Sequence, residues 1–188
     1  MSSPITEMRL GVSNQIVWLG VNPNTPLGAI WVGLSEDGLV AVDLQPDMEG
    51  IRRAVARFGY RNLVQDNRRV QLILDQIGAY LAGERTNFDI PINWLVLTPF
   101  QERVLRATWE VPYGHTVTYG EIAQRINQPR AARAVGRAEA TNPMPLVIPC
   151  HRVLGADGGL HGYGAAEGLK TKAWLLRLEA ETLARLAG

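Results

Sequence analysis

The chain has 188 residues and a mass of 20.7 kDa, enough for one large domain or two small ones without metal or disulfide staples. Hydrophobic residues make up 46% and charged residues 20%, which argues against disordered, collagen-like and coiled-coil proteins. The single cysteine excludes an intramolecular disulfide and any zinc or iron–sulfur site that needs several cysteines. It also indicates a reducing compartment.

No window reaches the ~18 uninterrupted apolar residues of a membrane span, and residues 1–10 lack the pattern of a secretory signal. We therefore expect a cytoplasmic protein with no membrane partner. The net charge of +1 is unevenly distributed, because residues 1–98 carry 8 Lys+Arg against 10 Asp+Glu and residues 99–188 carry 11 against 8. The basic second half is suited either to bind a polyanion or to form a solvated helix face, and charge alone leaves both open.

Alternating apolar residues dominate the first part of the chain. They alternate along residues 15–21 and 29–44, which predicts β-strands. Asp37-Gly38 divides the second stretch, and this pair favours a tight turn because both of its residues tolerate positive φ. The pattern predicts a small antiparallel sheet.

Helical periodicity follows the strands. Residues 51–58 predict a short amphipathic helix, and residues 70–81 predict a longer one with apolar positions every 3.6 residues. Residues 90–97 are apolar and suit a connecting segment that packs against the body. We therefore expect two domains, residues 1–97 and residues 98–188.

Two capping signatures open the second domain. Residues 98–101 combine an N-cap threonine, a proline at the first helical position and a glutamine, and predict a helix to about Glu110. Residues 118–121 predict a second, short helix that ends near Pro129. Residues 130–140 predict a third helix with little bulk, since alanine supplies most of its helix propensity. Two short helices with a tight break between them are typical of a helix-turn-helix.

Three arginines mark the third predicted helix. Arg130, Arg133 and Arg137 are spaced i, i+3 and i+7, so all three should leave one helix face. The small residues beside them would let the helix backbone approach DNA closely.

The last third of the chain changes character twice. Residues 141–150 contain three prolines within seven residues, which predicts an extended segment. Residues 153–163 are rich in glycine and predict a loop. A closing amphipathic helix is predicted from its apolar stripe, which consists of Leu175, Leu176, Leu183 and Leu186.

Cys150 is the natural candidate for chemistry. It is followed directly by His151 and Arg152, and a neighbouring imidazole or cation lowers a thiol pKa from its free value of about 8.5. Adjacent residues on an extended chain point to opposite sides, so the sequence leaves open whether the imidazole bonds the sulfur directly or through a bridging water. The alternative is an inert core cysteine.

A third group is expected to orient the imidazole. Glu179 lies three or four residues from Leu175, Leu176 and Leu183, which places its carboxylate beside the apolar stripe. A carboxylate in that place needs a partner. The alternative is a carboxylate at the edge of the stripe that reaches water.

The segment 149–153, Pro-Cys-His-Arg-Val, resembles the active-site signature of the O6-alkylguanine-DNA alkyltransferases, also called methylated-DNA–protein-cysteine methyltransferases. The N-terminal half matches that family loosely, through residues 25–28 and its strands. The second half matches over about residues 98–179. The matching segments there, in the family's order, are Thr98-Pro99-Phe100-Gln101, Pro112-Tyr113-Gly114, Thr118-Tyr119-Gly120-Glu121, Ala131-Ala132-Arg133-Ala134-Val135-Gly136 and Asn142-Pro143.

The resemblance implies an α+β fold with a small antiparallel sheet and helix in the N-terminal domain. The C-terminal domain is then mostly helical and holds a helix-turn-helix and the active-site cysteine. The implied activity is irreversible, single-turnover transfer of an alkyl group from O6-alkylguanine, and from O4-alkylthymine, in DNA to Cys150. The alkylated atom is buried in the duplex, so attack requires base flipping.

The implied partner is double-stranded DNA bearing an alkylated guanine and contacted in its minor groove. The resemblance further implies a monomer that needs neither cofactor nor metal, and it leaves cooperative assembly along DNA open.

The family's functional residues can be placed on this sequence. Cys150 resembles the alkyl acceptor, and His151, acting through a water, and Glu179 resemble the relay that ionises it. Asn142 resembles the hinge between the DNA-binding motif and the active-site segment. Tyr119 resembles the residue that rotates the nucleotide and protonates guanine. The implied DNA-binding residues are Thr118, Tyr119, Arg130, Ala132, Arg133, Gly136 and Arg137, with Arg133 as the finger that enters the base stack. The implied pocket residues are Pro145, Arg152, Val153, Tyr163 and Gly164.

The chain departs from the family's pattern after Tyr163. Relatives have a small residue and a Gly-Gly pair there, whereas this chain reads Gly-Ala-Ala-Glu-Gly. The difference leaves open whether Lys170 or Lys172 matches the family's lysine. The zinc site of some relatives is not expected, since there is no second cysteine and His115 and His161 are expected in exposed loops.

Two other functions fit parts of the pattern. A cysteine, a histidine and a glutamate also suit a cysteine hydrolase, which would turn over repeatedly but would not explain the arginine face. A helix-turn-helix regulator or a damage-sensing relative would bind DNA without chemistry. Such sensing relatives lack the acceptor cysteine, which is present here as Cys150.

Overall fold

The computed structural model describes residues 14–45 and 47–188, so the expectation for residues 1–10 lies outside the described residues. The chain forms two compact units. The first comprises the chain up to Gly78 together with Asp89–Val96, and the second comprises Ala79–Phe88 together with Leu97–Gly188. Within the described ranges, no helix is both long and apolar enough to cross a bilayer.

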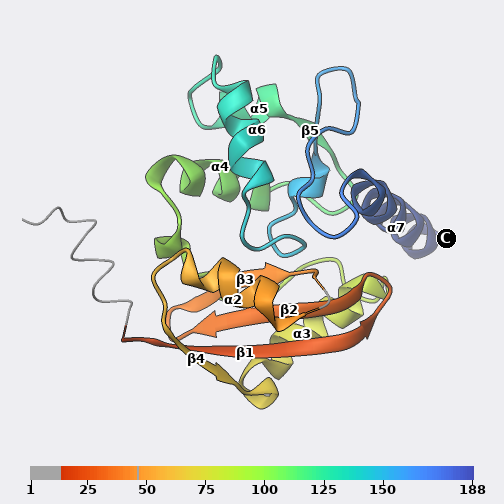
Figure 1. The fold of residues 1–188 in the computed structure, drawn as a ribbon. Coiled ribbons are helices and arrows are strands. Elements are labelled where there is room, and N and C mark those ends of the chain that lie inside the picture. The colour runs from red at the N-terminus through yellow and green to blue at the C-terminus, as the bar shows by residue number, and fades with distance from the viewer. Residues whose placement is uncertain (1–13, 46) are drawn as a thin grey trace, which may run out of the picture. The chain divides into compact units, whose positions relative to one another are not determined.

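A four-stranded sheet organises the first unit (Figure 1). Its order is β3-β2-β1-β4, and β2 pairs antiparallel with both β1 and β3. β4 pairs parallel with β1, so the prediction of a purely antiparallel sheet is wrong at this edge. β4 has four residues, too few to show an alternating pattern in the sequence. The strands are β1 (Ile16–Thr25), β2 (Gly28–Ser35), β3 (Gly38–Asp43) and β4 (Asn62–Gln65).

The predicted Asp37-Gly38 turn is confirmed between β2 and β3. Gly38 has a φ of 122°, and a Cβ atom there would lie 2.6 Å from the carbonyl oxygen of Pro91. The backbone of Leu39 bonds that same carbonyl at 2.8 Å. Only glycine can therefore hold both the turn and the close approach of residues 91–93.

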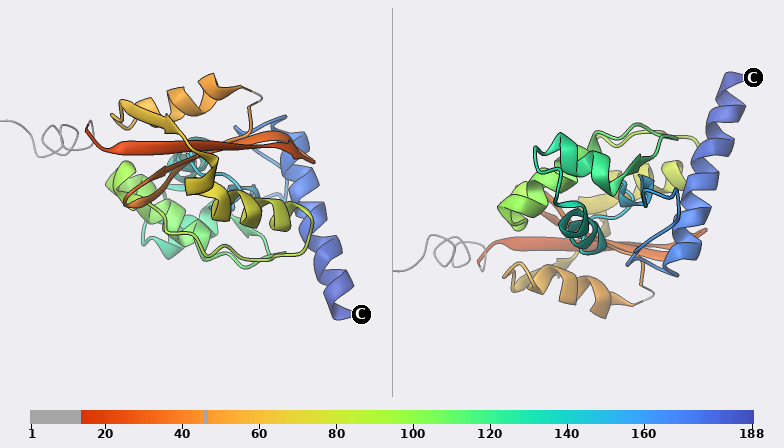
Figure 2. Two further views of the ribbon diagram at one scale, coloured as in Figure 1. Left: turned by 90° about the horizontal axis from the view of Figure 1, so that it is seen from below. Right: turned by 90° about the horizontal axis from the view of Figure 1, so that it is seen from above.

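Two helices lie on opposite faces of this sheet (Figure 2). α2 (Met48–Ala56) begins at Asp47, whose side chain accepts the N–H of Gly50 at 3.1 Å. It buries Ile51 and Val55 against the strands. α3 (Asn67–Leu81) covers the helix predicted over 70–81.

The second unit contains helices α4 (Pro99–Trp109), α5 (Tyr119–Arg125), α6 (Ala132–Ala140) and α7 (Leu169–Ala187). Both capping predictions are confirmed, with Thr98 accepting from Gln101 N and a complete capping box between Thr118 and Glu121. The short strands β5 (Val117–Thr118) and β6 (Val153–Leu154) pair in parallel. The 3-10 helices are η1 (Trp94–Val96), in the first unit, and η2 (Cys150–Arg152), in the second.

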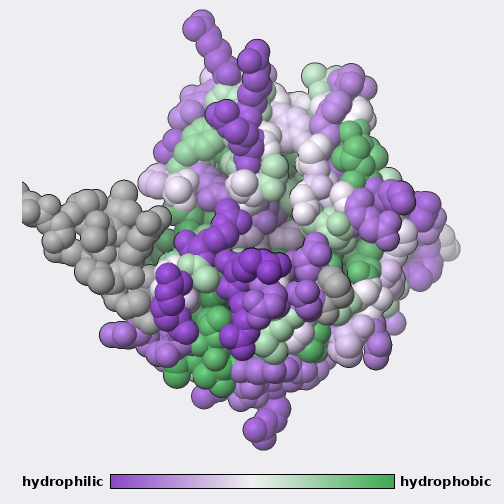
Figure 3. Space-filling model, viewed as in Figure 1, coloured by the Kyte–Doolittle hydropathy of each residue, from purple (hydrophilic) through white to green (hydrophobic). Residues whose placement is uncertain are grey.

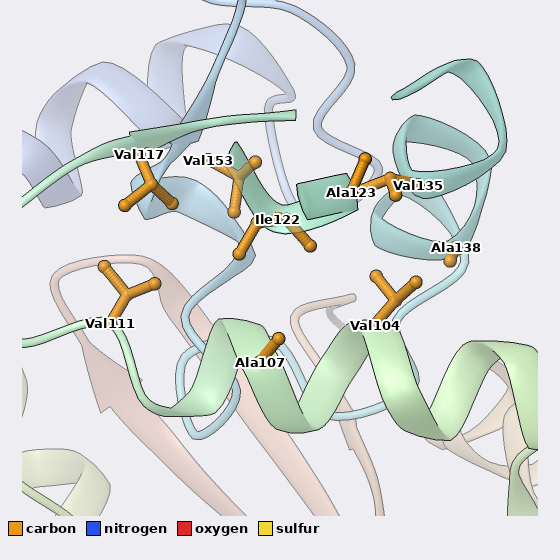
Figure 4. Close-up of a cluster of buried hydrophobic side chains, with 9 residues drawn as sticks. All are labelled: Val104, Ala107, Val111, Val117, Ile122, Ala123, Val135, Ala138 and Val153. Atoms are coloured by element: carbon orange, nitrogen blue, oxygen red, sulfur yellow. The ribbon is translucent and has the colours of Figure 1, made fainter. Parts of the chain in front are cut away.

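The second unit has its own hydrophobic core, in which α4, α5, α6 and the two short strands converge (Figure 4). Val104 of α4, Ile122 of α5, Val135 of α6 and Val153 of β6 are fully buried in it. Alanines between these side chains let the helices approach closely. The same core therefore packs against both β6, which follows η2, and α6, which carries Arg133 and Arg137.

Three predictions for this unit are wrong. α6 begins at Ala132, so Arg130 precedes the helix and the i, i+3, i+7 argument holds only for Arg133 and Arg137. Residues 141–150 form turns, with Leu146 at a φ of 72°, because the prolines exclude a helix without requiring an extended chain. Leu186 is 66% exposed, so the buried stripe of α7 ends before it.

Candidate active site

The sulfur of Cys150 lies at the start of η2 and is held by Asn142. The side-chain Nδ2 of Asn142 donates to Cys150 Sγ at 3.2 Å and to the carbonyl of Ile148 at 2.9 Å. Cys150 is 6% exposed. Because an N–H donor favours the charged form of its acceptor, Asn142 stabilises the thiolate over the thiol.

The resting sulfur is nevertheless a thiol. Burial, together with the charge of Glu139, raises the pKa of Cys150 to about 12, although Asn142 and Lys172 act in the opposite direction. The expectation of a lowered thiol pKa is therefore wrong for the resting protein. It assumed that the next residue in sequence, His151, would act on the sulfur, but the structure turns that imidazole toward a different partner.

His151 is a fully buried, neutral base. Its Nε2 lies 2.8 Å from Oε1 of Glu179, so Nε2 carries the proton and donates it to the carboxylate. Burial lowers the pKa of His151. Its Nδ1 atom is buried and has no hydrogen-bond partner in the described part of the chain, so the imidazole does not bond the sulfur directly.

Glu179 of α7 is buried, which decides between the two alternatives that its spacing left open. Its carboxylate accepts from His151, from Tyr80 OH at 2.5 Å, from Arg152 Nη2 at 2.9 Å and from Gly114 N at 2.8 Å. Burial alone would raise its pKa, but the hydrogen bonds from His151 and Arg152 and the charge of Arg152 lower the pKa of Glu179 to about 2. It is therefore a permanent carboxylate at neutral pH.

Tyr80 and Arg152 both donate hydrogen bonds to the Glu179 carboxylate. Arg152 was expected to line the pocket, but it also donates to Val111 O at 2.6 Å and is almost fully buried. The Tyr80 hydroxyl also lies 3.2 Å from His151 Nε2. Sequence analysis missed Tyr80 because its place in a helical apolar period resembles that of any core residue.

Lys172 is the buried lysine of the site. Its Nζ donates to Val153 O at 2.6 Å and to His161 O at 2.9 Å. Lys170 is exposed and pairs with Glu167 at 3.6 Å. The geometry therefore favours Lys172 over Lys170 as the match to the family's lysine.

Burial raises the pKa of Tyr119 to about 12 and raises that of Tyr163, and a charge on Cys150 raises both further. The Tyr119 hydroxyl donates to His161 O at 2.9 Å. The Tyr163 hydroxyl is buried and has no hydrogen-bond partner within residues 14–45 and 47–188.

The other expected pocket residues lie in the same region. Pro145 is buried, and the side chain of Val153 belongs to the hydrophobic core, so only its backbone is available to a ligand. A Cβ at Gly164 would lie 3.0 Å from the carbonyl oxygen of Ala140. Glycine therefore allows the loop to approach the end of α6.

The expected DNA-binding residues lie around α5 and α6, where strongly hydrophilic side chains project from the surface (Figure 3). Arg130, Arg133 and Arg137 are exposed there. A Cβ at Gly136 would lie 3.8 Å from the ring of Tyr119, so the two helices approach closely at this point. Two further residues of the set are half-buried: Thr118, which caps α5, and Ala132, which begins α6.

No group of three or more His, Cys, Asp or Glu side chains within the described ranges is placed to hold a metal ion. His161, one of the two expected loop histidines, lies 3.2 Å from Asp157. The other, His115, is also exposed.

Comparison with known proteins gives the family. Residues 99–181 match the DNA-binding domain of 6-O-methylguanine DNA methyltransferase, and residues 23–94 match its ribonuclease-like domain. The chain is 41% identical to the methylated-DNA–protein-cysteine methyltransferase of Methanosarcina acetivorans over 155 residues, covering 82% of this chain and 94% of that protein. This chain belongs to that methyltransferase family.

Other methyltransferases of the family agree. The relative from Mycolicibacterium paratuberculosis is 55% identical over 106 residues, which span 56% of this chain and 62% of that protein. The crystal structure of Mycobacterium tuberculosis O6-methylguanine methyltransferase matches with a TM-score of 0.74 at 36% identity and covers 88% of this chain and 94% of that one. The same M. tuberculosis protein in complex with DNA matches with a TM-score of 0.73 at 34% identity and the same coverage. The α+β fold and the resemblance inferred from sequence are thereby confirmed.

Proposed function

We propose that this protein repairs DNA by moving an alkyl group from the O6 atom of guanine to Cys150. The observation that carries the proposal is a buried, neutral His151 that directly follows the buried Cys150 in the chain. Nε2 of His151 is fixed on Glu179 at 2.8 Å, and its Nδ1 atom has no partner within the described residues. The names of the relatives give the substrate class.

The chemistry follows from the placed atoms. A water bridging Cys150 and His151 carries the thiol proton to Nδ1, and Glu179 stabilises the imidazolium that results. The thiolate attacks the alkyl carbon, the bond from that carbon to O6 breaks, and guanine leaves with a proton. Because the product is a thioether, each molecule acts once.

A thiol with a pKa of about 12 is a resting state of low reactivity. Only a very small fraction is thiolate at neutral pH, so its reaction with soluble electrophiles is slow. Proton transfer to His151 occurs when a substrate carbon is held against the sulfur, so proximity supplies much of the lowering of the barrier. Asn142, which already donates to the sulfur, supports the charge as it forms.

DNA binding is assigned to the α5–α6 region. Exposed Arg133 enters the stack where the damaged nucleotide swings out, and Arg130 and Arg137 contact phosphates on either side of the minor groove. The Tyr119 hydroxyl, which bonds His161 O in the resting protein, turns to guanine and supplies its proton. The same pocket accepts O4-alkylthymine, and the protein acts as a cytoplasmic monomer.

Mass spectrometry after incubation with a duplex carrying O6-methylguanine tests the proposal. The expected result is a gain of one methyl on the peptide containing Cys150, in a one-to-one ratio with protein, and no gain in Cys150→Ser. Repeated turnover would show a hydrolase, and DNA binding without transfer would show a regulator or sensor. Either result overturns the proposal.

A further inference from the structure

The proposed reaction leaves one buried acid unused. Glu139 of α6 is 3% exposed and contacts a single hydrogen-bond partner, the hydroxyl of Thr108 on α4, which lies 2.5 Å from its Oε1. Its Oε2 atom is buried and has no partner in the described residues. A carboxylate with so little support is costly to bury, which favours the neutral acid.

The hydrogen bonds of Thr108 also favour a protonated, neutral Glu139. Its Oγ1 lies 3.0 Å from the carbonyl oxygen of Val104 and 2.5 Å from Glu139 Oε1. A hydroxyl has one proton and a carbonyl has none. Both contacts are full, unshared hydrogen bonds when Thr108 donates its proton to Val104 O and a protonated Glu139 donates to Thr108 Oγ1. Burial raises the pKa of Glu139 to about 8, in agreement with this assignment.

Asn142 links Glu139 to the sulfur, because its backbone N–H donates to Glu139 O at 3.1 Å and its side chain donates to Cys150 Sγ at 3.2 Å. Three titratable groups on other elements interact electrostatically with Glu139. They are Cys150 of η2, Lys172 of α7 and Tyr119 of α5. Lys172 is the one cation among them, and it interacts with both Glu139 and Cys150. One positive charge balances one anion, so a carboxylate at Glu139 and a thiolate at Cys150 compete for it.

We propose that Glu139 controls the reactivity of Cys150 through its own proton. When Glu139 is neutral, the positive charge of Lys172 stabilises the thiolate of Cys150. When Glu139 is ionised, its carboxylate interacts with Lys172 and disfavours formation of the thiolate. The inference builds on the proposed function, in which the thiolate is the acceptor, but the reactivity of the sulfur is measurable without DNA.

Iodoacetamide provides the test, because the chain has one cysteine and each alkylation forms a bond to Cys150 Sγ and releases iodide. The rate is measured against pH for wild type, Glu139→Gln and a matched control, Glu181→Gln, whose side chain on α7 is 70% exposed. Below about pH 7 the three proteins should react within about twofold of one another, since Glu139 is neutral there. Near pH 9.5 Glu139→Gln should react roughly tenfold faster than the other two, since one pKa unit of coupling is a factor of ten. Equal rates for the folded variants at both pH values would overturn the inference.

A second measurement needs no substitution at Glu139. Carbon NMR of wild-type protein labelled at the glutamate carboxyls should show one carboxyl that titrates near pH 8. Titration of every glutamate below about pH 6 would contradict the inference. Methyl transfer from the methylated duplex is measured in a separate experiment. A failure of the proposed repair function can therefore be distinguished from a failure of the proposed coupling between Glu139 and Cys150.

Discussion

At the scale of single residues, Glu179 has the densest set of contacts in the site. Its two carboxylate oxygens accept hydrogen bonds from His151, Tyr80, Arg152 and Gly114, and none of its side chain is exposed. A buried charge is stable only when such donors satisfy it. The residue that orients the base is therefore also a structural anchor.

We expect Glu179→Gln to lower the free energy of unfolding by about 3–5 kcal/mol, because the charge of Arg152 would remain buried without its partner. Urea unfolding at neutral pH measures this loss, with Glu181→Gln as the exposed control. A loss no larger than that of the control would show that Arg152 does not depend on Glu179.

The same carboxylate predicts a pH dependence of stability. The pKa of Glu179 is lowered from 4.5 to about 2 by folding, so its stabilisation is fully present above about pH 4.5 and is lost as the pH falls toward 2. Wild type should lose more stability than Glu179→Gln across that window. Parallel curves for the two proteins would contradict the assigned pKa.

At the scale of elements, α6 carries residues of both proposals, the DNA contact and the control of Cys150 by Glu139. Its outer face bears Arg133 and Arg137, and its inner face bears Glu139 and the core residue Val135. Asn142 follows the helix directly and bonds the sulfur. The proposed DNA contact at Arg137 is therefore only five residues from Asn142, which holds the acceptor sulfur.

Arg133→Ala should slow repair of duplex DNA roughly tenfold or more, since extruding a base costs a few kcal/mol and the arginine is proposed to fill the gap. Reaction with free O6-methylguanine should be nearly unchanged, because no base must be extruded. The rates of methyl transfer to each substrate measure the difference, with Arg177→Ala on α7 as an exposed arginine control. Equal losses on both substrates would exclude the proposed role.

At the scale of the whole molecule, the buried position of Cys150 has a cost after reaction. A methyl group on the sulfur of Cys150, a residue that is 6% exposed, overpacks the site. Overpacking costs about 1–3 kcal/mol. The methylated protein should melt roughly 2–10 °C below the unmodified one in calorimetry, given the usual relation for proteins of this size. An unchanged melting temperature after complete methylation would argue against a packed site.

Local signals predicted much of this fold. The Asp37-Gly38 turn and the caps at Thr98 and Thr118 follow from spacing within a few residues, whereas spacing left the burial of Glu179 open. β4 could not be predicted, since its four residues are set by pairing with a distant strand.

The contacts within the site were largely hidden from the sequence. Tyr80 meets Glu179 across 99 residues, and Glu139 meets Thr108 across 31. The pKa of Cys150 was predicted in the wrong direction because burial depends on the whole unit and not on adjacent residues. Periodicity marks a position as buried but does not say which polar group it will contact.

The placement of residues 79–88 bears on how the chain can be divided. A fragment that starts at Leu97, where the connecting segment ends, would lack Tyr80, whose hydroxyl donates to Glu179. It would also lack Gly83, whose carbonyl is bonded by Arg185. An excised catalytic half would thus have to carry the final turn of α3 and the loop after it, although both precede the boundary that the sequence suggests.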